Sequence, residues 1–180
     1  MKEKYIPIIG TISAGKSTFL KAFLGVTMLQ TGATTTTKFV CLIKNSNRNC
    51  FYHVIPNKNN GIKFIKDGEK TIGEEEIQKR IEEIKRNFSE KKPNKNDIFY
   101  MLETPIKTIK NTYLLNNCYF MDIPGLNENN STYIEDIFSL ITINDILFEI
   151  MIFDSTSIGS DNILDIFKKL EKKNSYIFNK

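Results

Sequence analysis

The sequence predicts an α/β fold: a mostly parallel sheet with at least one antiparallel edge strand and helices on both of its faces. Short apolar runs alternate along the chain with amphipathic segments of helical period, which is the order expected of a sheet covered by helices. One run, Phe148–Phe153, is continuously apolar, as is typical of a buried parallel strand. With 180 residues and 41% hydrophobic content, the chain is long enough for one domain with a buried core. We therefore expect a single domain over residues 1–180.

The first predicted elements surround a glycine-containing turn. Tyr5–Ile9 predicts a buried strand, and we expect Pro7 at its start because proline gives a central strand no amide donor. Ser17–Leu24 predicts a helix that ends at Gly25. After a threonine-rich loop, two apolar runs separated by a polar turn predict a β-hairpin: Phe39–Ile43 and Phe51–Ile55.

The clearest amphipathic helix follows this hairpin. Its start, Thr71 to Glu74, has the form of a capping box. Apolar residues then recur at helical spacing between charges, at Ile77, Ile81, Ile84 and Phe88. The later segments predict, in order, strands at Tyr100–Ile109 and Cys118–Ile123 around a turn at Asn116-Asn117, a helix over Ser131–Ile141, the strand Phe148–Phe153, a helix over Ser160–Lys169 and a strand at Ser175–Phe178.

The turn after the first strand matches the phosphate-binding pattern GxxxxGK[ST] without a mismatch, as Gly-Thr-Ile-Ser-Ala-Gly-Lys-Ser. Glycines let successive amides turn toward phosphate oxygens, and the following helix adds its positive end. Lys16 would reach the β- and γ-phosphates, and the Ser17 hydroxyl would bind Mg²⁺. A ligand-free turn is the alternative, but the position between a strand and a helix favours a P-loop NTPase fold. The predicted binding residues are Gly10, Ser13, Ala14, Gly15, Lys16, Ser17 and Thr18.

A second motif, Asp122-Ile123-Pro124-Gly125, ends a predicted strand. A carboxylate at a strand tip can hold the water shell of Mg²⁺ from the side opposite Ser17. Gly125 can present its backbone amide to the γ-phosphate. The pattern alone is common in turns, so its weight comes from following a P-loop in the expected order.

The threonine-rich loop offers a third metal ligand. A GTPase needs one loop threonine that contacts Mg²⁺ and the γ-phosphate. Four neighbours compete for this role in the run Thr34–Thr37; Thr36 is our first choice and Thr37 our second. A polar loop leading into a strand is the alternative interpretation.

Asn179 and Lys180, the last two residues, follow the last predicted strand. GTPases recognise guanine at this place with Asn-Lys-x-Asp, whose aspartate accepts hydrogen bonds from the base. The sequence ends before that aspartate, and an Asn-Lys pair also occurs by chance in a chain rich in both residues. Its position favours the motif, so we expect Asn179 and Lys180 to contact the nucleotide. The choice between GTP and ATP stays open.

The sequence resembles the GTPase domain of dynamin-like large GTPases in three segments: Ile12 to Leu20, the threonine-rich loop, and Asp122 to Leu126. The long interval between the loop and Asp122 also fits this family, since small GTPases have only a short hairpin there. The resemblance runs from Ile6 to Lys180, which implies a partial, N-terminal GTPase domain of a longer protein. Ile12 departs from the family, which often has a glutamine there to orient the attacking water.

The resemblance implies magnesium-dependent hydrolysis of GTP to GDP and phosphate. It implies catalytic roles for Ser13, Lys16 and Thr36, with Ser13 near the β–γ bridge, and a metal site at Ser17, Thr36 and Asp122. It also implies a nucleotide-dependent homodimer through this domain, and membrane remodelling by a longer protein attached peripherally through other regions. Two alternatives remain: a nucleotide-dependent binding module without turnover, and an ATP-using P-loop NTPase.

Composition and sequence patterns limit the other partners and the cellular location that we expect. The 25 Lys and Arg residues and 21 Asp and Glu residues are interspersed, which indicates no nucleic-acid surface. The N-terminus has no signal-peptide pattern, and no apolar run approaches the roughly 20 residues of a membrane span. Three cysteines without a CxxC pair, Cys41, Cys50 and Cys118, indicate reduced thiols in a cytoplasmic chain. His53, the only histidine, is expected to be structural.

Overall fold

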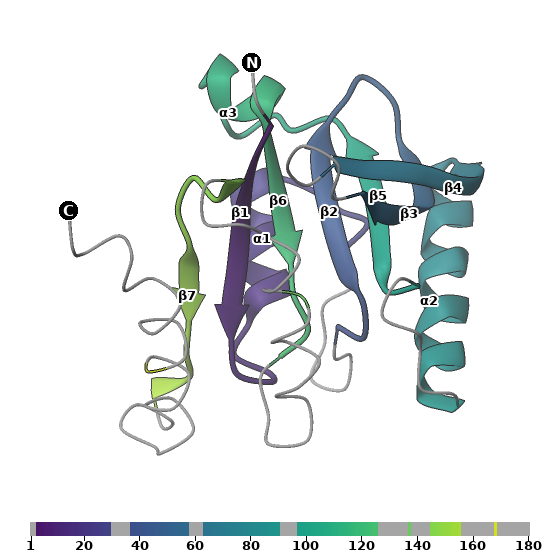
Figure 1. Cartoon of the computed structure of the whole chain (residues 1–180), viewed down its shortest axis with the longest axis horizontal. Coiled ribbons are helices and arrows are strands. Elements are labelled where there is room, and N and C mark those ends of the chain that lie inside the picture. Colours follow the sequence, from purple (N-terminus) through teal and green to yellow (C-terminus); the bar gives the residue numbers. More distant parts are fainter. Residues whose placement is uncertain are drawn as a thin grey trace.

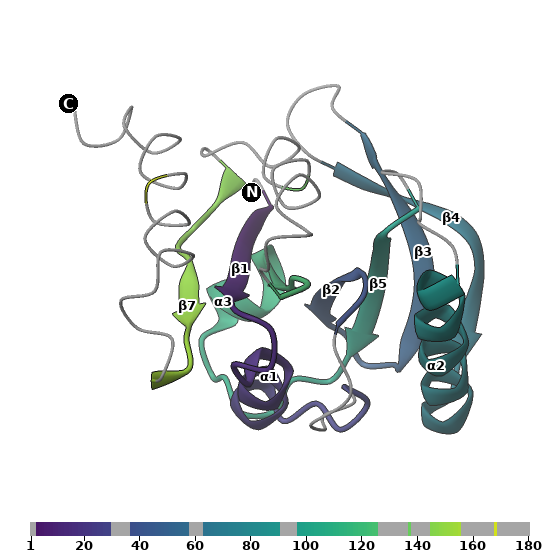
Figure 2. The same ribbon diagram turned by 90° about the horizontal axis from the view of Figure 1, so that it is seen from below.

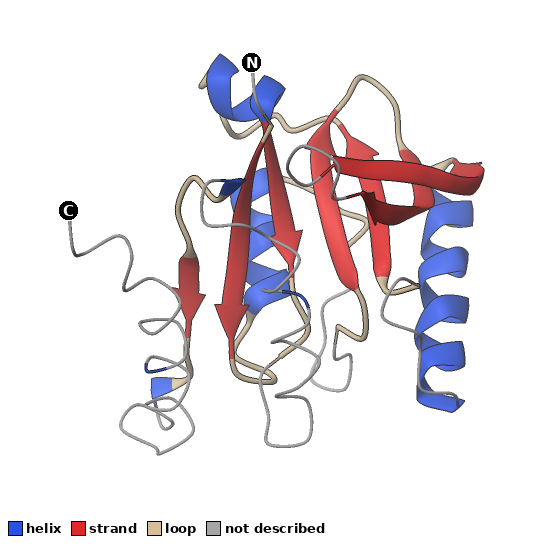
Figure 3. Cartoon of the chain, in the orientation of Figure 1, coloured by secondary structure: helices blue, strands red, loops and turns tan. Residues whose placement is uncertain are grey.

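The computed structural model describes residues 3–29, 37–57, 63–90, 97–125 and 145–155, together with Ile137 and Lys168. Its strands form one seven-stranded sheet with the order β4-β3-β5-β2-β6-β1-β7 (Figure 1). The strands are β1 (Lys4–Gly10), β2 (Val40–Asn45), β3 (Cys50–Asn57), β4 (Lys63–Ile72), β5 (Phe99–Thr104), β6 (Cys118–Asp122) and β7 (Ile150–Ile152). The helices are α1 (Lys16–Leu24), α2 (Glu74–Glu90) and α3 (Thr112–Asn117). The predicted α/β class is confirmed (Figure 3).

Antiparallel pairing extends well beyond one edge strand. β1 pairs in parallel with β6 and β7, and β2 with β5, whereas β2–β6, β3–β4 and β3–β5 are antiparallel. The predicted hairpin of Phe39–Ile43 with Phe51–Ile55 is therefore wrong, because β5 lies between β2 and β3. A polar turn between two apolar runs shows that the chain reverses. It does not show that β5, a strand much later in the chain, enters between them.

The outermost strand, β4, was not predicted. All of its residues are exposed or half-exposed, and its sequence lacks the apolar alternation that marks a half-buried strand. Thr71 belongs to β4, opposite Phe51, so the predicted capping box is wrong. α2 begins instead at Glu74, after Gly73 with φ 99°, whose carbonyl accepts a 3.0 Å hydrogen bond from the amide of Ile77. On the same hairpin His53 faces Asp67 across the strands, with Nδ1 2.9 Å from the carboxylate.

Pro7 lies inside β1 and not at its start, which corrects the prediction. β1 is central among the described strands, with β6 on one side and β7 on the other. The Tyr5 carbonyl accepts from the amide of Leu147, so the odd-numbered residues of this parallel strand direct their backbone groups toward the β7 side. Regular pairing with β7 begins only at Ile8. Pro7, which has no amide hydrogen, therefore lies where the pairing between β1 and β7 is interrupted. No hydrogen bond between these strands is lost there.

Two other predicted segments are shorter than expected. β5 ends at Thr104, because Pro105 and the following residues leave the sheet; the Ile106 amide donates to Asn45 Oδ1. The predicted turn at Asn116-Asn117 is the end of α3, a six-residue helix capped by the Asn111 side chain. The predicted strand Phe148–Phe153 is confirmed as parallel only over Ile150–Ile152. Its predicted burial is wrong, because these three residues are half-buried and Phe148 is exposed.

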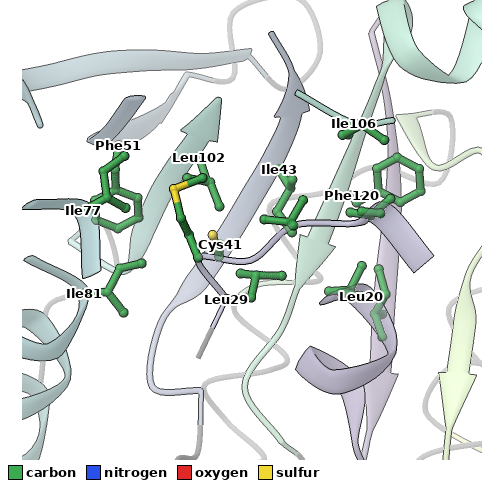
Figure 4. Packing of buried hydrophobic residues seen from close by; sticks show 14 of the residues in the cluster. Leu20, Leu29, Cys41, Ile43, Phe51, Ile77, Ile81, Leu102, Ile106 and Phe120 are labelled. Carbon is green, nitrogen blue, oxygen red and sulfur yellow. The ribbon is translucent and has the colours of Figure 1, made fainter. Parts of the chain in front are cut away.

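Buried residues form two layers, one on each face of the sheet. Helices α1 and α2 lie on the same side of the sheet (Figure 2) and pack Leu20, Ile77 and Ile81 against β2, β5 and β6 (Figure 4). On the opposite face, Ile137 is helical and fully buried. All three cysteines are buried free thiols, as predicted.

The rest of the predictions fall largely outside the described residues. The predicted helices at 131–141 and 160–169 lie there, apart from Ile137 and Lys168, which are helical. The predicted strand at 175–178 and the residues Thr34 to Thr36, Asn179 and Lys180 lie there as well. None of the described helices is both long and apolar enough to cross a lipid bilayer.

Candidate nucleotide-binding site

The P-loop joins β1 to α1, as its sequence predicts (Figure 1). Gly10 ends β1 so close to β7 that a Cβ atom there would lie 1.8 Å from the Ile152 carbonyl oxygen. Ser13 and Gly15 have positive φ values of 59° and 89°. These left-handed backbone conformations curl the loop, and residues other than glycine, asparagine and aspartate rarely adopt the one that Ser13 has.

The first turn of α1 is suited to an anion. Its N-cap residue is Gly15, which has no side chain to occupy the free amides, and no acidic residue lies in the turn. α3 differs, because its first amides donate to the Asn111 side chain. The amides at the start of α1 are thus left to bind a ligand, and the helix dipole favours a negative one.

Lys16 is buried beneath the loop, with 6% of its surface exposed. Its ammonium donates to the carbonyl oxygens of Thr11 at 2.8 Å and Gly10 at 3.2 Å. Burial lowers the pKa of Lys16, and the negative charge of Asp122 opposes this shift. The ammonium is held inside the loop, where phosphate oxygens can replace the two carbonyls as its partners.

Three oxygen-bearing side chains converge beside Lys16. Ser17 Oγ donates to Asp122 Oδ2 at 2.7 Å, Thr37 Oγ1 donates to the same oxygen at 3.2 Å, and the two hydroxyl oxygens are 3.0 Å apart. Asp122 is 2% exposed, and its other oxygen, Oδ1, is buried with no hydrogen-bond partner among the described residues. Burial raises the pKa of Asp122, while the hydrogen bond from Ser17 and the charge of Lys16 act in the opposite direction.

This donor set fits Mg²⁺. The ion prefers oxygen ligands and keeps several waters, so a carboxylate and two hydroxyls suit it without a full protein cage. The unsatisfied Oδ1 of Asp122 is the kind of buried atom that a hydrated cation would satisfy. Ser17 and Asp122 come together as their motifs predict. Thr37, our second choice, lies beside Ser17 and Asp122, whereas Thr36, our first choice, lies outside the described residues.

Gly125 lies directly against the P-loop. A Cβ atom at this position would be 2.7 Å from the Ile12 Cα atom and 2.8 Å from its nitrogen. The segment after β6 therefore lies so close to the loop backbone that a side chain at this position would clash with Ile12. The sequence predicts that Gly125 presents its backbone amide to the γ-phosphate. The close contact with Ile12 is a second reason why this position requires glycine.

One charged side chain near this site was not predicted. Lys85 of α2 is half-buried, and Asp122 is the first among the charges that act on its pKa. Lys85 lies one turn after Ile81 on the apolar side of the helix. A lysine within an apolar stripe is the sequence feature that could have indicated it.

Comparison with known proteins identifies the family. The family model described as the Dynamin family matches residues 6–178, nearly the whole chain. The chain belongs to the dynamin family. It is thus a dynamin-like GTPase domain, and GTP binding and hydrolysis are the general activity of such domains. The predicted P-loop GTPase fold is confirmed.

No curated protein matches this dynamin-family chain. Among solved structures it is similar to two chains described as an oligomerised bacterial dynamin pair that provides a mechanism for long-range sensing and tethering of membranes. The identities are 17% and 16%, with TM-scores of 0.39 and 0.42. These matches cover 96% and 94% of this chain but only 29% and 28% of the bacterial chains. The chain thus spans less than a third of the length of those proteins.

Proposed function

We propose that this chain binds GTP together with Mg²⁺ and hydrolyses it to GDP and phosphate, as the GTPase domain of a longer dynamin-like protein. The observation that carries this proposal is the convergence of Ser17, Thr37 and Asp122 beside the buried ammonium of Lys16. A purely structural cluster would satisfy its buried carboxylate, whereas Asp122 Oδ1 has no partner among the described residues.

Each residue of the site has a distinct role in this proposal. The amides of the P-loop and of the first turn of α1 hold the phosphates, and Lys16 places its charge at the β- and γ-phosphates. Ser17, Thr37 and Asp122 hold the hydrated metal, and Gly125 offers its amide to the γ-phosphate. When bound, Mg²⁺ supplies positive charge to the phosphate oxygens.

The reaction is attack of water on the γ-phosphorus, in line with the bond to the β–γ bridging oxygen, which breaks to release GDP. Ser13 lies in the loop where its hydroxyl can approach that bridge. Ile12 has no group that orients water, in contrast to the glutamine often found at this place in the family, so we expect slow turnover by the isolated chain.

Three finer proposals follow from the family alone. Asn179 and Lys180 begin the guanine-recognition motif, and the domain forms a homodimer when nucleotide is bound. Regions outside this sequence attach the protein peripherally to a membrane that it remodels, from the cytoplasmic side.

Phosphate release is the direct test. We expect release from GTP that requires Mg²⁺ and is abolished by EDTA. Tight binding of GTP without release would favour the nucleotide-dependent binding module instead. Faster release and tighter binding with ATP than with GTP would identify an ATP-using enzyme. Absence of binding to either nucleotide would contradict the proposal.

Ser13→Gly is expected to stabilise the folded chain and to slow hydrolysis. The left-handed φ of 59° costs a serine about 1–2 kcal/mol that glycine does not incur. The greater freedom of glycine in the unfolded chain offsets about half of this gain, so the melting temperature should rise by roughly 2 °C. Hydrolysis should fall because the hydroxyl beside the β–γ bridge is lost.

Thermal melts and phosphate-release rates of the variant check both effects. Ala14→Gly is the matched control for the melts, because Ala14 has no positive φ and its replacement by glycine should lower the melting temperature. A lower melting temperature for Ser13→Gly than for the parent would show that its backbone is not strained.

A further inference from the structure

The metal-side carboxylate lies on the sheet face that two helices cover. Side chains alternate along a strand, so Asp122 shares its face with Phe120 and Cys118, both of which pack in the layer under α1 and α2. Asp122 is the register partner of Cys41 on the neighbouring strand β2, and Cys41 packs in the same layer. Asp122 therefore lies between α1, which carries Lys16 and Ser17, and the part of the layer that α2 covers.

The C-terminal half of α2 extends to the same edge of the sheet. β1 and β6 end at the edge that carries the P-loop, and α2 runs toward that edge (Figure 1). Ile77 lies beside Phe51 of β3, and Ile81 points into the same layer, toward the side chains of β2 and β5 (Figure 4). Lys85 follows Ile81 by four residues, so its side chain leaves the helix on the same side, one turn closer to the edge.

The charge environment of Lys85 agrees with this placement. Burial lowers its pKa, and the negative charge of Asp122 opposes that shift. The influence is mutual, because Lys85 also acts to lower the pKa of Asp122. The neighbouring basic residues on α2, Lys79 and Arg86, are exposed.

We propose that Lys85 is a second ammonium of the nucleotide site, supplied by α2, which favours GTP over GDP by attracting the terminal phosphate. This inference rests on the proposed function. Thr37 and Asp122 mark the part of the site where the metal and γ-phosphate would lie, and α2 carries Lys85 on the side of Asp122 opposite to α1. A charge there interacts strongly with a γ-phosphate and only weakly with the more distant β-phosphate, since the interaction falls with distance and is strong in a partly buried site.

The test compares affinities for GDP and for a non-hydrolysable GTP analogue in the presence of Mg²⁺. Lys85→Met keeps the apolar stem and removes the charge. We expect it to weaken binding of the analogue about tenfold and binding of GDP less than about twofold. Lys85→Arg should keep the parental ratio of affinities. Lys79→Met removes an equal charge from the exposed side of α2 and should change neither affinity.

Added salt gives a second readout. The advantage of the parent over Lys85→Met for the analogue should shrink as salt rises, because it is electrostatic. If Lys85 only packs against the sheet, Lys85→Met will lower the melting temperature and leave the ratio of the two affinities unchanged, which would overturn the inference. Lys85→Gln, a neutral polar replacement, gives the same comparison if the methionine variant does not fold.

Failure of this inference is distinguishable from failure of the proposed function. If the parent binds both nucleotides, Lys16→Ala binds neither, and Lys85→Met keeps the parental ratio, only the role of Lys85 is wrong. If the folded parent binds neither nucleotide, the proposed function itself fails, and the role of Lys85 fails with it.

Discussion

Replacing Lys16 with alanine is expected to reduce affinity for GTP by at least about 100-fold while the chain remains folded. A charge-assisted hydrogen bond contributes about 1.5–3 kcal/mol, and Lys16 is placed to make such bonds to two phosphates. Each 1.4 kcal/mol is about a tenfold change in affinity, so their loss corresponds to two or more factors of ten. GDP binding should fall as well, since one of the two phosphates is the β-phosphate.

The fold should survive because Lys16 adds little to the stability of the empty domain. Burial lowers the pKa of Lys16, so its charged form is less favourable in the folded chain than in water. The carbonyls of Gly10 and Thr11 lose their donor, but the adjacent Ile12 and Ser13 are exposed and water can reach the loop.

Titration with a fluorescent GTP analogue measures the affinity, and circular dichroism checks the fold. Lys21→Ala, a lysine of the last turn of α1, is the matched control and should bind as the parent does. Parental affinity in a folded Lys16→Ala variant would show that the P-loop does not hold the nucleotide.

The P-loop could be predicted from the sequence because its chemistry is local. Phosphate binding by successive amides needs contiguous residues, from Gly10 to Ser17, and a strand and a helix on either side. Asp122 could be predicted for a related reason: its strand must end where β1 ends, and parallel neighbours bring their carboxyl ends to one edge.

Strand order could not be predicted in the same way. β2 and β3 follow each other in sequence, yet β5 separates them, because partners are chosen by burial over the whole sheet. β4 escaped detection since an exposed edge strand needs no apolar alternation. The position of Pro7 inside β1 could not be predicted, because no local sequence pattern marks the point where the pairing between β1 and β7 is interrupted.

The site residues that sequence reasoning missed or ranked lower are those chosen by distant contacts. Four adjacent threonines are chemically identical, so the sequence does not distinguish them; among the described residues Thr37 contacts Ser17 and Asp122. Lys85 is separated from Asp122 by 37 residues of sequence, the difference between 122 and 85, and by the strand β5. Such a pair becomes apparent only in the folded domain, where the charge of Asp122 acts on Lys85.

Replacing Asp122 with asparagine is expected to have opposite effects on metal-dependent binding and on the stability of the empty domain. Asparagine keeps an oxygen that can accept from Ser17 and Thr37 but carries no charge. Changes in the residues that orient a metal typically cost 10- to 100-fold in metal affinity, so the gain in GTP affinity on adding Mg²⁺ should fall by about 100-fold. Hydrolysis should be lost with it.

The nucleotide-free variant should melt at a higher temperature than the parent at neutral pH. Burial raises the pKa of Asp122 in the folded state, so between the ordinary carboxyl pKa and the raised one the folded chain binds more protons than the unfolded chain. Stability of the parent therefore falls as pH rises through that interval. Asp122→Asn removes the titrating group and should abolish this part of the pH dependence.

Isothermal titration with and without Mg²⁺, and thermal melts across pH, separate the two effects. Asp67→Asn is the matched control, because it removes an exposed carboxylate that faces His53 and should leave the magnesium dependence unchanged. Undiminished magnesium dependence in folded Asp122→Asn would exclude Asp122 as the metal-side acid. A lower melting temperature of the variant would show that the Asp122 carboxylate stabilises the nucleotide-free domain. The unpaired Oδ1 atom would then not be a feature that lowers stability for the sake of metal binding.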